Sequence, residues 1–106
     1  MFARTVSTHL NANSAAEFTK TVENQILPLL RKQKGFQDEI TLLVPGGKQV
    51  MAISFWDTKE SADAYERTTY PQVLSALAKV VEGTPKVETY EVSNSTAHKI
   101  AARIAA

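Results

Sequence analysis

The sequence contains no cysteine, and its only imidazoles are those of His9 and His98. The absence of thiols excludes disulfide scaffolding, thiolate catalysis, iron–sulfur ligation and zinc sites built on Cys. Two imidazoles are too few for a His-rich metal site. We therefore expect a domain that folds without disulfides and holds no metal.

An excess of charge of one sign is also missing, as are long apolar runs. Twelve Lys and Arg stand against 11 Asp and Glu, and no basic run indicates a surface that follows a phosphate backbone. No apolar run approaches the length of a membrane span. The N-terminus, MFARTVSTHL, lacks the basic segment and apolar stretch of a signal peptide. We expect a cytoplasmic protein without nucleic-acid or membrane partners.

The 106 residues suffice for one domain with a single thin core. Short alternations of apolar residues predict four strands, at residues 2–10, 36–44, 49–56 and 87–92. On the predicted second strand, one face carries Phe36, Ile40, Leu42 and Val44.

Helical spacing of apolar residues predicts a long helix that starts at Ser14 and ends at Gly35, and Pro28 should kink it or locally loosen it. A second helical region follows the third strand, is broken at Tyr70 and Pro71, and ends at Gly83. The order β-α-β-β-α-β predicts a ferredoxin-like α+β fold with helices on one face of the sheet. Residues 1–93 form this domain, and residues 94–106 form a C-terminal tail or arm.

Apolar residues on both faces of the third predicted strand indicate a homodimer. One face carries Met51, Ile53 and Phe55, and the other carries Val50, Ala52 and Trp56. In a chain this small, the helices cover only one face of the sheet, so a second copy is expected to bury the other face by an isologous twofold pairing. The alternative is a partly exposed sheet with scattered apolar residues.

Two segments carry a family resemblance. Residues 53–62 read ISFWDTKESA, a strand that ends in Trp and passes directly into a helix, and Gly35-Phe36 opens a strand after the long first helix. On these motifs the chain, from about Phe2 to Val92, resembles the antibiotic-biosynthesis-monooxygenase-like family of dimeric α+β barrels. The resemblance implies an apolar pocket between sheet and helices. It says little about function, because the family includes oxygenases, haem-degrading enzymes and stress proteins.

The chain departs from the family pattern at several positions. Family members often carry His nine residues after the Trp and again about five residues later, where this sequence has Tyr65 and Tyr70. The positions nearest to the Asn, Trp and iron-ligating His of the haem-degrading branch are Val6, Tyr65 and Ser75. A serine cannot replace an axial imidazole, so haem degradation is not expected.

Three aromatic residues are candidates for a substrate site. Trp56 could wall a pocket for a flat substrate, or serve only as a core aromatic at the junction of strand and helix. The phenols of Tyr65 and Tyr70 could donate a hydrogen bond to a ligand or exchange a proton with it. Their alternative role is packing with the hydroxyl at the surface.

Two basic residues of the first strand are further candidates. His9 could act as a general base, because imidazole titrates near neutrality; otherwise it is a satisfied residue at a strand end. Arg4 could bind an anionic ligand if it faces the helices, and otherwise forms an ion pair at the sheet edge. His98, in the tail with Ile100 and Ile104, is expected to be solvated.

Two functions remain open. The first is a cofactor-independent monooxygenase for a small aromatic, quinol-like compound, with Trp56 positioning the ring and Tyr65, Tyr70 and His9 handling protons. Such substrates give electrons to oxygen themselves once deprotonated, so no cofactor is expected. The second is a non-catalytic dimer that binds a small apolar ligand or takes part in a stress response. A His9 that points away from the pocket favours binding.

Overall fold

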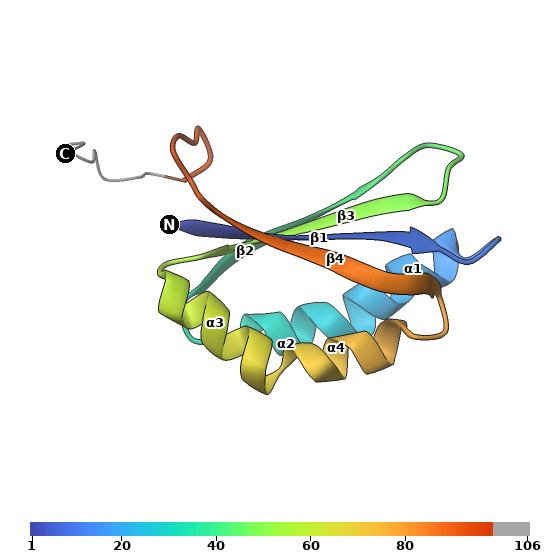
Figure 1. Cartoon of the computed structure of the whole chain (residues 1–106), viewed down its shortest axis with the longest axis horizontal. Coiled ribbons are helices and arrows are strands. Elements are labelled where there is room, and N and C mark those ends of the chain that lie inside the picture. Colours follow the sequence, from blue (N-terminus) through green and yellow to red (C-terminus); the bar gives the residue numbers. More distant parts are fainter. Residues whose placement is uncertain (99–106) are drawn as a thin grey trace.

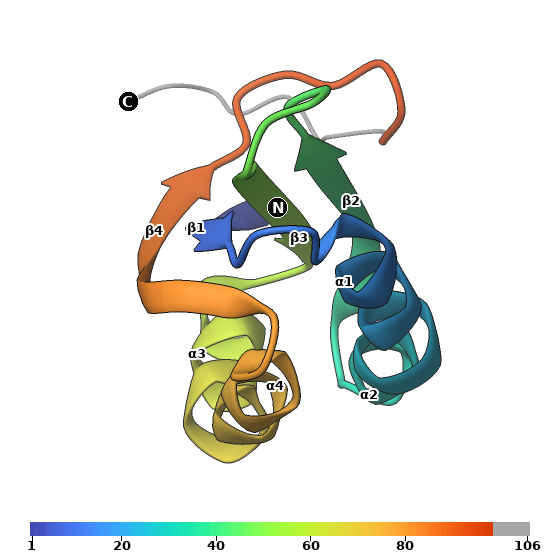
Figure 2. The same cartoon turned by 90° about the vertical axis from the view of Figure 1, so that its right-hand side faces the viewer.

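The computed structural model describes residues 1–98, in which the elements follow the order β-α-β-β-α-β (Figure 1). The four strands are β1 (Phe2–Leu10), β2 (Phe36–Leu43), β3 (Gln49–Trp56) and β4 (Val81–Glu91). They form one sheet in the order β2-β3-β1-β4, with every neighbouring pair antiparallel. Figure 2 shows both helical regions on the same side of this sheet. The predicted ferredoxin-like α+β fold is confirmed.

The first helical region runs through α1 (Ala15–Thr21), a π-helical segment η1 (Val22–Ile26) and α2 (Leu27–Arg31). Pro28 explains the irregularity, because proline has no N–H and its ring clashes with the carbonyl four residues earlier. The π-helical segment lies directly before the turn that contains Pro28. The predicted disturbance at Pro28 is therefore confirmed as a change of helix type within a continuous helical region.

The second helical region is divided into α3 (Lys59–Thr68) and α4 (Tyr70–Leu77), as the sequence predicts. The α3 helix begins where the Thr58 side chain accepts a hydrogen bond from the Ser61 backbone N–H at 3.2 Å. Pro71 lies in the first turn of α4, where its missing N–H costs nothing.

The predicted boundaries after α4 are wrong. The helix ends at Leu77 rather than at Gly83, and β4 begins at Val81 rather than at Val87. Residues 81 and 82 already pair with the end of β1, and a register shift accommodates the turn-forming residues that follow. Pro85 lies within this irregularity, between the paired residues Glu82 and Lys86, and β4 is an edge strand, where a proline is tolerated.

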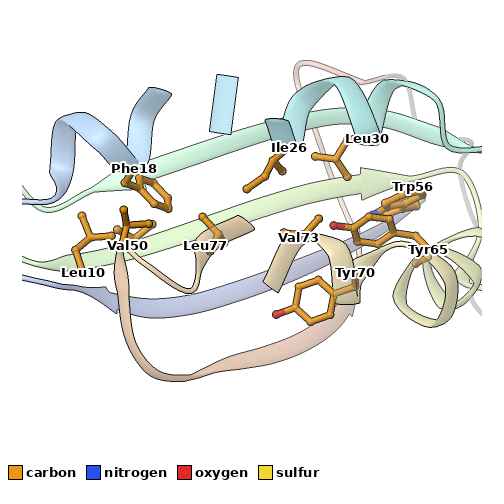
Figure 3. Close-up of a cluster of buried hydrophobic side chains, with 12 residues drawn as sticks. Leu10, Phe18, Ile26, Leu30, Val50, Trp56, Tyr65, Tyr70, Val73 and Leu77 are labelled. Carbon is orange, nitrogen blue, oxygen red and sulfur yellow. The ribbon is translucent and has the colours of Figure 1, made fainter. Parts of the chain in front are cut away.

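The hydrophobic core lies between the sheet and the helices. Its most completely buried large side chains come from β1, β3 and the segment after α4; they are Leu10, Val50, Trp56 and Val80. Figure 3 shows how residues from the strands and from both helical regions meet there. This layer separates the sheet from the helices along the length of β3.

A β-bulge at Gln37 decides which side chains of β2 face the helices. Phe36 and Asp38 pair with the consecutive residues Trp56 and Phe55, so Gln37 is an extra residue in the ladder. Phe36 packs edge-on against Trp56, and Glu39 faces the helices as well. The prediction that Phe36 shares a face with Ile40, Leu42 and Val44 is therefore wrong, because the bulge reverses the alternation after Phe36.

The other face of the sheet, called here the open face, carries no helix (Figure 1). Its apolar side chains include Ile40, Leu42 and Tyr90, which are 45%, 50% and 50% exposed. Met51, Ile53 and Phe55 lie between them on β3 and are half-buried. This arrangement leaves a continuous apolar strip across β2 and β3.

The chain after β4 passes over part of the open face (Figure 2). The ring centroid of His98 lies 5.7 Å from that of Phe55, and His98 Nε2 lies 3.4 Å from Asp38 Oδ2. The expectation that His98 is solvated is therefore wrong, because residues 94–98 fold back onto the sheet. Ile100 and Ile104 lie outside the described residues.

Candidate functional site

A cavity of about 50 Å³ lies between the sheet and the helices. Most of its lining is apolar. The apolar residues come from β1, β3, α1, η1, α2 and α4, and they include Val6, Phe18, Val22, Ile26, Val50, Val73 and Leu77. The polar lining residues are Arg4, Thr8, Glu39, Thr41, Ser54, Tyr65 and Tyr70. An apolar hollow with a few convergent polar groups is the usual form of a small-molecule site.

Three of the polar residues form a row across the sheet. Arg4 on β1 pairs with Ser54 on β3, and Ser54 pairs with Glu39 on β2. All three side chains point to the helical layer, where the cavity lies. Since neighbouring strands are about 4.8 Å apart, the backbones of Arg4 and Glu39 are roughly 10 Å apart. A cation and a carboxyl group therefore face the same cavity from opposite sides of Ser54.

Arg4 is 3% exposed, which is unusual for a charged side chain. Its Nη2 donates to Glu66 Oε1 on α3 at 3.2 Å, and its guanidinium carbon lies 4.1 Å from the ring centroid of Tyr70. Its Nε makes no hydrogen bond with any part of residues 1–98. A buried donor without a partner carries a desolvation cost that an acceptor oxygen of a ligand would remove.

The two tyrosines form an aromatic cluster beside the Arg4 guanidinium. The Tyr65 ring centroid lies 5.0 Å from that of Trp56 and 6.2 Å from that of Tyr70. In Figure 3 the Tyr65 hydroxyl points toward the middle of the buried cluster. Burial raises the pKa of Tyr65 to about 12 from its ordinary 10.0, although the Arg4 charge acts in the opposite direction. Burial also raises the pKa of Tyr70. Both phenols are therefore hydrogen-bond donors near neutral pH, and neither is a base.

The raised pKa of Tyr65 gives a pH-dependent term in stability. Because unfolded Tyr65 loses its proton near pH 10 and the folded protein retains it, the free energy of unfolding should fall as the pH rises from about 10 to about 12. The full effect is about 3 kcal/mol. Urea unfolding of the native chain and of Tyr65→Phe at about pH 9 and about pH 12 measures it. The Phe variant should lose about 2–3 kcal/mol less than the native chain, and equal losses would contradict the assignment.

Glu39 is a site residue that alternation in the sequence did not identify. Burial raises the pKa of Glu39, and the hydrogen bond that Thr41 Oγ1 donates to Glu39 Oε2 at 2.6 Å partly offsets this effect. One signal was available: Asp38 and Glu39 are consecutive in a strand, so one of them must face the helices in either register. The bulge at Gln37 decides that it is Glu39.

The other predicted site residues lie in two different places. Trp56 is 0% exposed and donates a hydrogen bond from Nε1 to Ser54 Oγ at 2.9 Å. Its ring packs against Tyr65, but it does not itself line the cavity. His9 is exposed and has the parity of the open face, on the side of the sheet away from Arg4. The structure therefore brings together Arg4, Tyr65 and Tyr70 at the cavity, places Trp56 behind them, and does not bring His9 to it.

Within residues 1–98, no group of three or more His, Asp or Glu side chains is placed to hold a metal ion. In the same range, no helix is long and apolar enough to cross a membrane.

No protein-family model and no curated protein matches this sequence. Solved structures do match. A protein of unknown function from Nitrosomonas europaea is 17% identical with a TM-score of 0.75, over 96% of this chain and 95% of that one. A putative antibiotic biosynthesis monooxygenase from Bordetella bronchiseptica is 14% identical with a TM-score of 0.73, over 88% and 97%. A mutant of SnoaB, a cofactor-independent oxygenase from Streptomyces nogalater, is 13% identical with a TM-score of 0.75, over 92% and 97%. The TM-scores show a shared fold, and at these low identities the similarity shows the fold alone.

Proposed function

We propose that this chain, which has the fold of the antibiotic biosynthesis monooxygenase-like proteins, binds a small aromatic compound with an acidic hydroxyl and oxygenates it without a cofactor. The observation that carries the proposal is the buried Arg4, which lines an otherwise largely apolar cavity and has an Nε without a protein partner within residues 1–98. An apolar ring would fill the cavity, and an anionic oxygen would accept from Arg4.

The reaction needs no external reductant. A deprotonated quinol-like ring can pass an electron to oxygen. For an anthrone-like ring, oxidation of the methylene to a carbonyl follows R₂CH₂ + O₂ → R₂C=O + H₂O. For a para-hydroquinone, which has no methylene, oxygenation of a ring C–H follows C₆H₄(OH)₂ + O₂ → C₆H₃(OH)O₂ + H₂O. The substrate supplies all four electrons, of which two reduce the oxygen atom kept in the product and two the atom released as water. Arg4 would stabilise the substrate anion. Tyr65 and Tyr70 would donate hydrogen bonds, and Trp56 would hold Tyr65 in place.

The size of the cavity requires movement on binding. Its volume of about 50 Å³ is smaller than the ~150 Å³ of a cavity that holds benzene in another protein. The helices must therefore separate from the sheet to admit a ring. Val22 and Ile26, the first and last residues of the π-helical segment, both line the cavity, and such segments are common at functional sites. We propose that this π-helical segment moves away from the sheet when the ligand enters.

Oxygen consumption over a panel of hydroquinones and anthrone-like phenols tests the proposal. Uptake should exceed autoxidation in buffer without added metal, flavin or nicotinamide. Arg4→Met should lower kcat/KM about 10²–10³-fold, because it removes a charge preorganised for the substrate anion. Tyr65→Phe and Tyr70→Phe should each lower it less, and His9→Ala, on the open face, serves as the control. Rates equal to the autoxidation control across the panel would refute oxygenation.

A second function, binding without catalysis, has one observation in its favour. The imidazole of His9 faces away from the cavity, and the phenols of Tyr65 and Tyr70 stay protonated near neutrality. If none of these groups can accept the substrate's proton, the cavity would only bind the ligand. The same panel distinguishes the two functions, because a binding protein would take up the phenols and leave their autoxidation rate unchanged.

We also propose that the chain acts as a homodimer, paired through the open face. The support is the strip formed by Ile40, Leu42 and the half-buried β3 residues between them, an unusually apolar surface for a sheet face in water. A second copy presents the same strip and matches it by a twofold axis.

A further inference from the structure

We propose that Glu39 is the proton acceptor of the cavity and that its substrates are hydroquinone-like, with one oxygen held by Arg4 and a second hydroxyl placed at Glu39. This inference rests on the proposed function, and it supplies the base that His9 and the tyrosines do not provide.

The β-bulge at Gln37 is what turns the Glu39 side chain toward the cavity. Without the bulge at Gln37, the alternation that starts at Phe36 would turn Glu39 outward and Ile40 inward. Asp38 Oδ1 accepts a hydrogen bond from the Glu39 backbone N–H at 2.8 Å and fixes the chain just after the bulge. Bulges commonly re-aim a side chain beside a functional site. Here the bulge puts a carboxyl group into a hollow whose neighbouring strand positions on β3 are Ser54 and Ala52.

The surroundings of Glu39 suit a base. Thr41 holds Oε2 by a short hydrogen bond, which leaves Oε1 to meet a ligand. Within residues 1–98 no Lys or Arg forms an ion pair with this carboxylate. Partial burial raises its pKa toward the range in which a carboxylate accepts a proton more readily from a phenol. Glu39 also remains half-buried on an edge strand, so protons can exchange with solvent between turnovers.

The separation of the two charged groups defines the substrate class. Arg4 and Glu39 flank Ser54 in one row, and both line the cavity. A ring with oxygens at opposite edges can reach both groups at once, whereas a phenol with a single oxygen can reach only one. Para-hydroquinones and fused rings with distant oxygens should therefore be better substrates than simple phenols.

The proton transfer is balanced as ArOH + Glu39–COO⁻ → ArO⁻ + Glu39–COOH. The O–H bond of the substrate breaks, its electron pair stays on the ring, and the new O–H bond forms on Glu39. The negative charge spreads across the ring toward Arg4. The proton then passes from Glu39 to the reduced oxygen atom that is released as water, and this transfer restores the carboxylate.

Glu39→Gln tests the role with little change of shape. It should lower kcat about 10²–10⁴-fold with little change in the affinity for substrate. The native rate should rise as the carboxylate ionises on the acid side, and this limb should vanish in the variant. Glu39→Asp should recover part of the rate. Glu17→Gln, the same change on an exposed position of α1, should leave both the rate and the pH profile unchanged. An unchanged pH profile in Glu39→Gln would overturn the proposal and leave oxygenation intact.

A second readout does not depend on turnover. Bound 4-nitrophenol reports its own ionisation by absorbance. Its apparent pKa should fall in Glu39→Gln, because a neighbouring negative charge is removed, and should rise in Arg4→Met, because a positive charge is removed. These shifts in a protein that takes up no oxygen would uphold the site and refute the oxygenase function. Bound nitrophenol that titrates alike in all the variants would overturn the site itself.

Discussion

Leu42→Asp is expected to separate the dimer into single chains. The side chain is 50% exposed in one chain, so the substitution should barely affect folding. In the proposed dimer, the same position buries a carboxylate against an apolar strip without a partner, which costs several kcal/mol. A twofold interface repeats the change on both copies, so the dissociation constant should rise by more than about 10³-fold.

Sedimentation equilibrium at micromolar concentration measures this effect. The native chain should sediment at about twice its mass of 11.6 kDa, and Leu42→Asp at about one chain mass. Leu74→Asp is the matched control, because Leu74 is 37% exposed on α4, a helix on the other side of the sheet. Leu42 also lies away from the tail residues that contact Phe55 and Asp38. A native chain that stays monomeric, or a control that dissociates equally, would rule out the open face as the interface.

Trp56→Ala is expected to have the largest effect on stability. The side chain is fully buried, and its ring contacts Phe36 from β2 and Tyr65 from α3. It also donates to Ser54, whose hydroxyl lies in the polar row of the cavity. Truncation of a buried Trp to Ala typically costs 3–5 kcal/mol. That is a large fraction of the ~5–15 kcal/mol that stabilises a domain of this size.

Urea unfolding followed by circular dichroism measures the loss, since Trp56 is the only tryptophan and fluorescence disappears with it. The thermal midpoint should fall by on the order of 20 °C. Trp56→Phe, which keeps a ring and removes the N–H donor, should lose roughly half as much. A loss below about 1 kcal/mol for the Ala variant would mean that the junction of β3 and α3 is held by other contacts.

Much of the fold could be predicted because its signals are local. Alternation on β1 and β3, the helical spacing of apolar residues after Ser14, and the prolines at positions 28 and 71 each act within a few residues of themselves. The start of β4 could not be predicted, because its first residues pair with β1 from across the chain. Their own sequence, with Gly83 and Pro85, indicates a turn.

The candidate site could be predicted only in part, for the same physical reason. Arg4, Tyr65 and Tyr70 come from regular elements in which parity and helical spacing hold, and they meet at the cavity. His9 obeys the same parity rule, and that rule places it on the opposite face from Arg4. Glu39 follows an irregularity, and a β-bulge depends on the pairing of two strands rather than on the residues of one.

The bulge at Gln37 also has a consequence for the comparison of sequences. Phe36 and Asp38 pair with consecutive residues of β3, so a shorter chain that lacks residue 37 could form the same ladder without interruption. Its inward and outward side chains would be the same as here. In an alignment with such a chain, a one-residue gap belongs at Gln37. An ungapped alignment would match Glu39 with an outward-facing position and conceal an equivalent carboxylate.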